Sequence, residues 1–124
     1  MKILIVEDRP DHLRLAHDVL SAEGHEIRDA AGAREAWESI RQDRPDIILL
    51  DLSLPGIDGL TLARKLKNDP KTRSIHIVAV TAYPDNWKKE MVLGAGCEGF
   101  LLKPISVRTL AQDLADAAEG DSSL

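Results

Sequence analysis

Five short apolar runs alternate with amphipathic segments along the chain, and this alternation restricts the possible folds more than any other feature of the sequence. Residues 3–6 (ILIV) form a continuous aliphatic run, which is typical of a parallel strand buried on both faces. The order predicts an α/β fold in which a parallel sheet carries helices on both faces. The other predicted strands are residues 25–30, 47–50, 75–80 and 98–102, and the predicted helices are residues 10–24, 33–44, 59–68, 85–93 and 107–118.

The length of 124 residues leaves room for one domain, which we expect to span residues 1–120 with a short tail at 121–124. The net charge is −5 and 3% of the residues are aromatic, which argues against direct DNA or RNA binding. The apolar run before Glu7 is too short for a signal peptide or a membrane span. A single cysteine, Cys97, cannot form an internal disulfide. We therefore expect a cytoplasmic protein that binds neither DNA nor a membrane.

Charged and hydroxyl side chains stand at the carboxyl ends of four predicted strands, where an open α/β sheet binds its ligand. Glu7 and Asp8 follow the first strand, Asp51 the third, Thr81 the fourth and Lys103 the fifth. Three carboxylates at one edge repel one another unless cations join them. Lys103 can neutralise one, and Mg²⁺ favours carboxylates together with phosphate oxygens. The sequence therefore predicts a site for Mg²⁺ and a phosphoryl group, with Lys103 and Thr81 left to bind phosphoryl oxygens.

Each of these residues also has a simpler interpretation when it is taken alone. Glu7 or Asp8 could cap the helix that opens at Pro10, Thr81 could form a turn, and Lys103 could be a solvated surface lysine. It is the joint placement of the residues that favours a phosphoryl site. The four histidines lack the spacing of a helical zinc site, so surface positions are favoured for His12, His17, His25 and His76.

Four motifs stand in order along the chain, each at a strand end. They are IVED with Glu7 and Asp8, DLSLPGIDG around Asp51, VTA at residues 80–82, and LKP at residues 102–104. With them the whole chain resembles a response-regulator receiver domain of two-component signalling, of the stand-alone type. The stretches VAVTAY and GCEGFLLKPIS give it some resemblance to receivers of the DivK type. The resemblance implies a flavodoxin-like, doubly wound (βα)5 fold with a five-stranded parallel sheet of order 2-1-3-4-5.

The resemblance also implies a role for each residue of the site. Asp51 would accept a phosphoryl group from a phosphohistidine of a sensor histidine kinase or a histidine phosphotransfer protein. Asp8 and Asp51 would bind Mg²⁺ directly, Glu7 would bind it mainly through water, and the backbone carbonyl of Ser53 would complete the protein ligands. Mn²⁺ could substitute. The cation and Lys103 would offset the charge of the transition state.

A switch is implied as well. Thr81 would move toward the phosphoryl group, and Phe100 would rotate into the vacated space, although a lone aromatic on a strand is usually a core residue. The surface formed by residues 85–118 would then change and control a downstream protein. The Lys103–Pro104 bond would be cis. The protein would be a monomer or a dimer promoted by phosphorylation, and it would catalyse only its own phosphorylation and dephosphorylation.

Two alternatives remain beside the stand-alone receiver. One is a receiver excised from a hybrid histidine kinase or a multidomain regulator. The other is an aspartyl-phosphate phosphatase of the haloacid-dehalogenase kind, which also uses an Asp nucleophile and Mg²⁺. That class places a second Asp two residues after the nucleophile, where this chain has Ser53.

Overall fold

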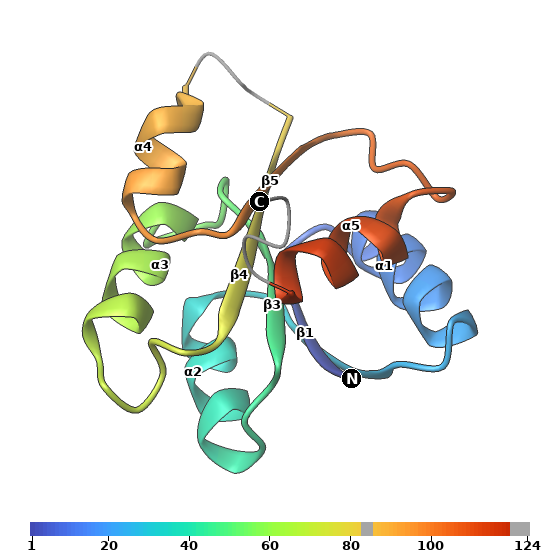
Figure 1. Cartoon of the computed structure of the whole chain (residues 1–124), viewed down its shortest axis with the longest axis horizontal. Coiled ribbons are helices and arrows are strands. Elements are labelled where there is room, and N and C mark those ends of the chain that lie inside the picture. Colours follow the sequence, from blue (N-terminus) through green and yellow to red (C-terminus); the bar gives the residue numbers. More distant parts are fainter. Residues whose placement is uncertain (83–85, 120–124) are drawn as a thin grey trace.

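Five parallel strands form one sheet in the order β2-β1-β3-β4-β5, as predicted (Figure 1). The computed structural model describes residues 1–82 and 86–119. The strands are β1 (Lys2–Val6), β2 (Glu26–Ala30), β3 (Ile47–Asp51), β4 (His76–Thr81) and β5 (Gly99–Leu102). The helices are α1 (Pro10–Ala22), α2 (Ala33–Gln42), α3 (Gly59–Asn68), α4 (Lys89–Gly94) and α5 (Leu110–Ala118).

Alternation along the central strands divides the core between the two faces of the sheet. On β3, Ile47 and Leu49 belong to a cluster with α1 and α5, whereas Ile48 and Leu50 pack with α2, α3 and α4. Figure 1 shows the same two helix layers on opposite sides of the strands. All five residues of β3 are buried, which explains why its sequence is an unbroken apolar run that ends at Asp51.

The last two helices begin later than the sequence indicates. Helix α4 begins at Lys89 rather than at residue 85, and Asp85 itself lies outside the described residues. Helix α5 begins at Leu110 rather than at Val107, because Val107 is 54% exposed and does not join the buried stripe that starts at Leu110. The predicted domain end at residue 120 and the tail at 121–124 also lie outside the described residues.

The start of α3 lies against the end of β3 and fixes the backbone around Asp51. The N–H of Gly59 donates to the carbonyl of Leu52 at 3.0 Å, and the Asp58 side chain caps the helix by accepting from the N–H of Thr61 at 2.8 Å. A Cβ at Gly59 would lie 2.4 Å from the carbonyl oxygen of Asp51 and 2.8 Å from the Cα of Leu52. Glycine is therefore required here for close approach.

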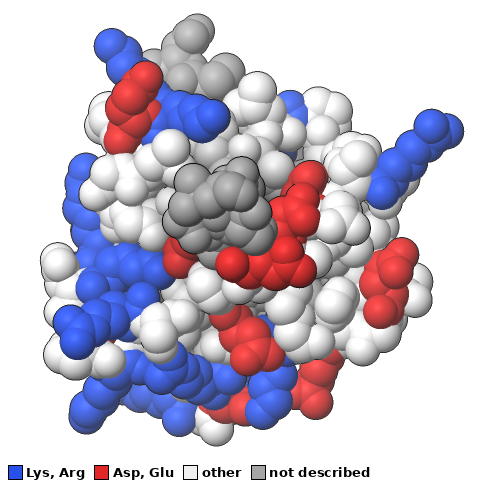
Figure 2. All heavy atoms as spheres, viewed as in Figure 1, with Lys and Arg blue, Asp and Glu red and all other residues white. Residues whose placement is uncertain are grey.

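Charge is unevenly distributed over the molecule. Residues 59–75 carry five basic side chains and one acidic side chain, although the whole chain has a net charge of −5. Figure 2 shows Lys and Arg gathered on the side of the molecule where α3 lies and along the lower edge. Across residues 1–82 and 86–119, no helix has both the length and the apolar character needed to cross a membrane.

Candidate functional site

The carboxyl ends of β1, β3, β4 and β5 lie side by side because the strands pair in parallel register. Val6 pairs with Leu50, Asp51 with Val80, and Thr81 with Leu102. The polar residues that follow or end these strands are therefore brought to one edge, as the sequence predicts.

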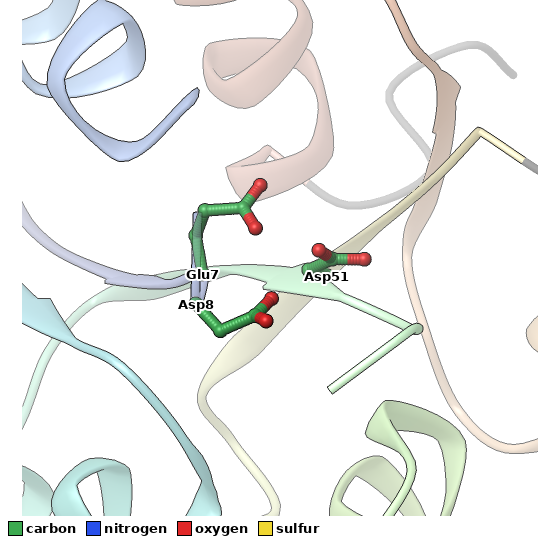
Figure 3. Close-up of side chains that lie close together, drawn as sticks. All are labelled: Glu7, Asp8 and Asp51. Carbon is green, nitrogen blue, oxygen red and sulfur yellow. The ribbon is translucent and has the colours of Figure 1, made fainter. Parts of the chain in front are cut away.

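Three carboxylates meet at this edge. One oxygen each of Glu7, Asp8 and Asp51 lies within 4.8 Å of the others (Figure 3). Glu7 and Asp51 are buried, at 6% and 5% exposure, whereas Asp8 is exposed to solvent. The cluster thus has two desolvated carboxylates and one open side.

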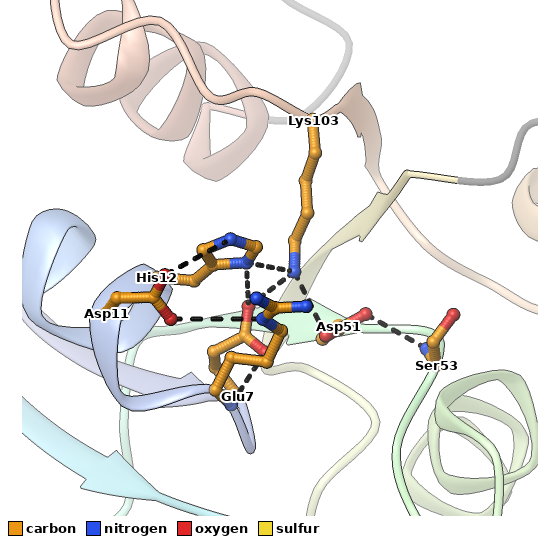
Figure 4. A network of polar contacts seen from close by, with 7 residues as sticks. Glu7, Asp11, His12, Asp51, Ser53 and Lys103 are labelled. Atoms are coloured by element: carbon orange, nitrogen blue, oxygen red, sulfur yellow. Dashed lines mark hydrogen bonds and ion pairs between the residues drawn. The ribbon is translucent and has the colours of Figure 1, made fainter.

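Lys103 enters the cluster from the chain that follows β5. Its Nζ lies 2.6 Å from Oε1 of Glu7 and 3.1 Å from Oδ2 of Asp51 (Figure 4). The Lys103 side chain is only 10% exposed, so it is not the solvated surface lysine that the residue alone would suggest. Its backbone N–H donates to the carbonyl of Thr81 at 2.9 Å, and its peptide bond to Pro104 is cis.

Backbone N–H groups hold the two buried carboxylates. Ser53 donates to Oδ1 of Asp51 at 2.9 Å, and Arg9 donates to Oε2 of Glu7 at 3.2 Å. The N-cap position of α1 is Arg9, not Glu7 or Asp8, so the capping interpretation of these two acids does not describe this structure. The metal-binding role of the Ser53 carbonyl stays a prediction.

The pKa values of the cluster are shifted in opposite directions. Burial and the neighbouring Asp51 raise the pKa of Glu7 to about 7, against the opposing pull of Lys103. Burial alone would raise the pKa of Asp51, but the Glu7 carboxyl, the Ser53 N–H and the Lys103 ammonium together hold it below its ordinary value. Burial acts to lower the pKa of Lys103, but the two carboxylates outweigh it and raise that pKa.

The raised pKa of Glu7 predicts a pH-dependent cost to stability in the metal-free protein. A raised pKa means that the folded state holds the proton more tightly, so the free energy of unfolding falls from pH 4.5 to about 7 and stays low above it. Glu7→Gln should therefore raise the free energy of unfolding by about 2 kcal/mol at pH 8 and by much less at pH 5. Urea unfolding in EDTA at pH 8 and at pH 5 measures these two changes in the free energy of unfolding. The exposed control Glu23→Gln should change it by less than about 0.5 kcal/mol, and an equal gain for Glu7→Gln at both pH values would contradict the assignment.

Thr81 and Phe100 lie on the same face of the sheet. Thr81 ends β4 and is fully buried, while Phe100 pairs with Ala79 on the neighbouring strand and is partly buried against the α2–α3–α4 core. Ala79 and Thr81 are two positions apart on β4, so their side chains point to one side. The positions suit the predicted switch, whose operation stays a prediction.

His12 is the residue of this site that the sequence did not reveal. Its Nδ1 lies 3.0 Å from Nζ of Lys103 and 3.7 Å from Oε1 of Glu7 (Figure 4). The spacing of the histidines relative to one another carries no information about this contact. The available signal was local: His12 falls in the first turn of the helix that begins directly after Glu7 and Asp8, and that turn folds back toward them.

The donor set suits a hard divalent cation. It consists of carboxylate oxygens, which Mg²⁺ prefers over nitrogen and sulfur. A single ammonium faces two buried carboxylates with an exposed third nearby, and the pKa of Glu7 is raised by its burial and by the neighbouring Asp51 even with Lys103 in contact. Asp8, Asp51 and Glu7 are the side chains that would hold the cation.

Comparison with known proteins gives consistent matches over the whole fold. The family model for the response regulator receiver domain matches residues 3–115. The polar-differentiation response regulator DivK of Brucella anthropi is 37% identical over 119 residues, covering 93% of this chain and 97% of its own length. The chemotaxis response regulator CheY4 of Vibrio cholerae has a similar structure, with a TM-score of 0.85 and 26% identity over 94% of this chain and 97% of that one. The signal receiver domain of a signal transduction histidine kinase from Syntrophus aciditrophicus has a TM-score of 0.86 and 30% identity, over 99% of this chain and 93% of that one.

Proposed function

This chain belongs to the response regulator receiver domain family of two-component signalling, and from that membership we propose that Asp51 accepts a phosphoryl group from a phosphohistidine of a partner protein. The observation that supports this most directly is the position of Asp51, a buried carboxylate held between the Ser53 N–H and the Lys103 ammonium, at the edge where Glu7 and Asp8 also converge.

In the transfer, a carboxylate oxygen of Asp51 attacks phosphorus and forms an O–P bond. The N–P bond to the donor imidazole breaks, and the imidazole nitrogen keeps the electron pair and takes up a proton. The low pKa of Asp51 keeps its carboxylate ionised and ready to attack. Lys103 places a positive charge 3.1 Å from Oδ2 of Asp51, where charge develops on the phosphoryl oxygens. A bound Mg²⁺, held by Asp8, Asp51, Glu7 and the Ser53 carbonyl, would supply the remaining charge neutralisation.

The phosphodonor can dock beside the site. An apolar hollow of about 170 Å³ is lined by Leu15, Pro104 and Ile105 together with His12 and Lys103, so it opens next to the phosphoacceptor. Leu15 on α1 is 43% exposed, which is unusual for a large apolar side chain in this structure. Apolar contact with this hollow would orient the phosphohistidine of the donor toward Asp51. The donor that we propose is a sensor histidine kinase or a histidine phosphotransfer protein.

The output surface is formed by α4, β5, α5 and the loops between them. Within the described residues, five large apolar side chains are strongly exposed, and four of them lie there: Met91, Leu93, Leu102 and Val107. Exposed apolar side chains on one set of neighbouring elements suit contact with a protein partner. Movement of Thr81 toward the phosphoryl group, with Phe100 filling the space behind it, would change this surface.

Labelling with acetyl phosphate tests the proposed chemistry without a partner. We expect one phosphoryl group per chain in Mg²⁺ and almost none after EDTA, because the carboxylate cluster then lacks the cation that offsets its charge. Intact-protein mass spectrometry measures the label, and cleavage by hydroxylamine shows that it is an acyl phosphate. Mn²⁺ should restore labelling after EDTA and extra Ca²⁺ should restore less, since Ca²⁺ takes longer bonds and looser geometry. Equal labelling with and without the divalent cation would refute the proposal.

One alternative has a specific observation in its favour. The match to a receiver domain of a histidine kinase over 93% of that domain keeps open a receiver that works beside a kinase in a larger protein. The phosphoryl chemistry would be the same. The haloacid-dehalogenase kind of phosphatase lacks such support, since Ser53 offers a hydroxyl where that class uses a second carboxylate. Repeated release of phosphate from small phosphate esters would distinguish it from labelling of Asp51.

A further inference from the structure

Three acceptors surround the ammonium group of Lys103, which has three N–H donors. Two are the buried carboxylates, with Oε1 of Glu7 at 2.6 Å and Oδ2 of Asp51 at 3.1 Å. The third is Nδ1 of His12 at 3.0 Å. These three contacts match the three donors of the ammonium, and His12 supplies the one that comes from outside the carboxylate cluster.

The contact fixes the tautomer of His12. A lysine ammonium donates hydrogen bonds and cannot accept them, so Nδ1 must be the unprotonated nitrogen of the ring. The ring proton is then on Nε2, which faces Oδ2 of Asp11 at 3.9 Å. His12 lies in the first turn of α1, where the N–H of the next residue, Leu13, donates to the carbonyl of Arg9 at 2.9 Å. The acceptor nitrogen of His12 therefore lies on a regular helix and not on a loop.

The neutral His12 ring differs from the carboxylates of Glu7 and Asp51 in its effect on the charge of the Lys103 ammonium. Glu7 and Asp51 hold Lys103 but also neutralise its charge, and both are expected to turn oxygens toward a second cation. His12 takes no part in that carboxylate cluster. It can hold Nζ in place while leaving the full positive charge available to phosphoryl oxygens.

We propose that His12 is a positioning residue for Lys103, and that it holds the ammonium group over Asp51 during phosphoryl transfer. The proposal rests on the proposed function of Asp51 as phosphoacceptor. A lysine has four rotatable side-chain bonds, so without this contact its ammonium would sample other positions whenever the carboxylates engage a metal ion.

Rates of labelling by acetyl phosphate at saturating Mg²⁺ test this role. His12→Phe keeps a ring of similar size without an acceptor, and we expect it to slow labelling by on the order of tenfold. His12→Asn places an amide oxygen near the position of Nδ1 and should recover most of that loss. The matched control is His17→Phe on the same helix, because His17 is equally exposed and bonds Asp29 at 2.9 Å on the side facing β2. It should label at the wild-type rate.

A double-mutant cycle separates positioning from a general structural effect. If His12 acts through Lys103, then His12→Phe should cause no further loss in a Lys103→Ala background. A tenfold loss in both backgrounds would overturn the proposal, and so would labelling of His12→Phe at the wild-type rate.

A spectroscopic readout makes the inference independent of phosphorylation. In ¹⁵N NMR of the unphosphorylated protein, His12 should show a protonated Nε2 and an unprotonated Nδ1, and the Lys103 ammonium should give a signal protected from exchange with water. His12→Phe should lose that protection and His12→Asn should keep it; an unchanged Lys103 signal in His12→Phe would contradict the proposal. Failure of the wild-type protein to become labelled would refute the proposed function instead, while this contact could still be measured.

Discussion

Asp51→Asn should reduce labelling by acetyl phosphate in Mg²⁺ to background, while the wild-type protein accumulates an aspartyl phosphate. The amide that replaces the carboxylate has no anionic oxygen to attack phosphorus, and it removes one of the three acidic groups that meet at the sheet edge. The change is nearly isosteric, and the single amide oxygen can still accept one of the two hydrogen bonds that Ser53 and Lys103 donate to Asp51, so the fold should be retained. Intact mass and hydroxylamine sensitivity measure the outcome, and circular dichroism verifies folding.

The matched control for this variant is Asp58→Asn. Asp58 lies on the loop that joins β3 to α3, and its side chain caps α3, a role that Asn also fills well. This variant should become labelled at close to the wild-type rate. Labelling of Asp51→Asn at another residue, at a rate near that of the wild type, would show that Asp51 is not the phosphoacceptor.

Gly59→Ala should lower the free energy of unfolding by about 3 kcal/mol or more, the largest stability effect that we expect from removing a single glycine. The added Cβ would lie 2.4 Å from the Asp51 carbonyl oxygen and 2.8 Å from the Leu52 Cα, and both are backbone atoms that cannot rotate away. Gly59 has no positive φ, so the requirement is for space and not for an unusual backbone conformation. Urea unfolding measures the change.

Gly94→Ala provides the control for Gly59→Ala. Gly94 ends α4, and a Cβ there would meet no heavy atom within 4 Å in the described part of the chain. Alanine should therefore be neutral or stabilise the protein by up to about 1 kcal/mol. Equal destabilisation by the two substitutions would mean that the close approach of α3 to β3 does not limit stability.

Much of the fold could be predicted because its signals are local. The aliphatic runs of β1 and β3 are buried on both faces, so their sequences carry no competing polar pattern, and the parallel register then brings their ends together. The boundaries of α4 and α5 were less predictable. Val107 has the spacing of a core residue but lies 54% exposed, and only tertiary packing decides that the buried stripe begins at Leu110.

The site shows the same division between local and tertiary information. Glu7, Asp8, Asp51, Thr81 and Lys103 could be found because each stands at a strand end. The contact between His12 and Lys103 joins residues 91 positions apart, and no pattern in either segment indicates it. The opposite pKa shifts of Glu7 and Asp51 depend in the same way on burial and on which carboxylate lies nearer to each donor.

The strand order also affects how readily a change at Asp51 could alter the output surface. β5 is the last strand of the sheet and has four residues, and within residues 1–82 and 86–119 it pairs only with β4. Local opening of a short edge strand costs much less free energy than opening of a central one. Phe100 lies in β5 and Lys103 directly follows it, whereas Asp51 is the last residue of the fully buried β3. In the proposed function the phosphoryl group would therefore be held at a fully buried strand and detected at an edge strand, so a small change in interaction energy would be sufficient to shift the population of the output surface.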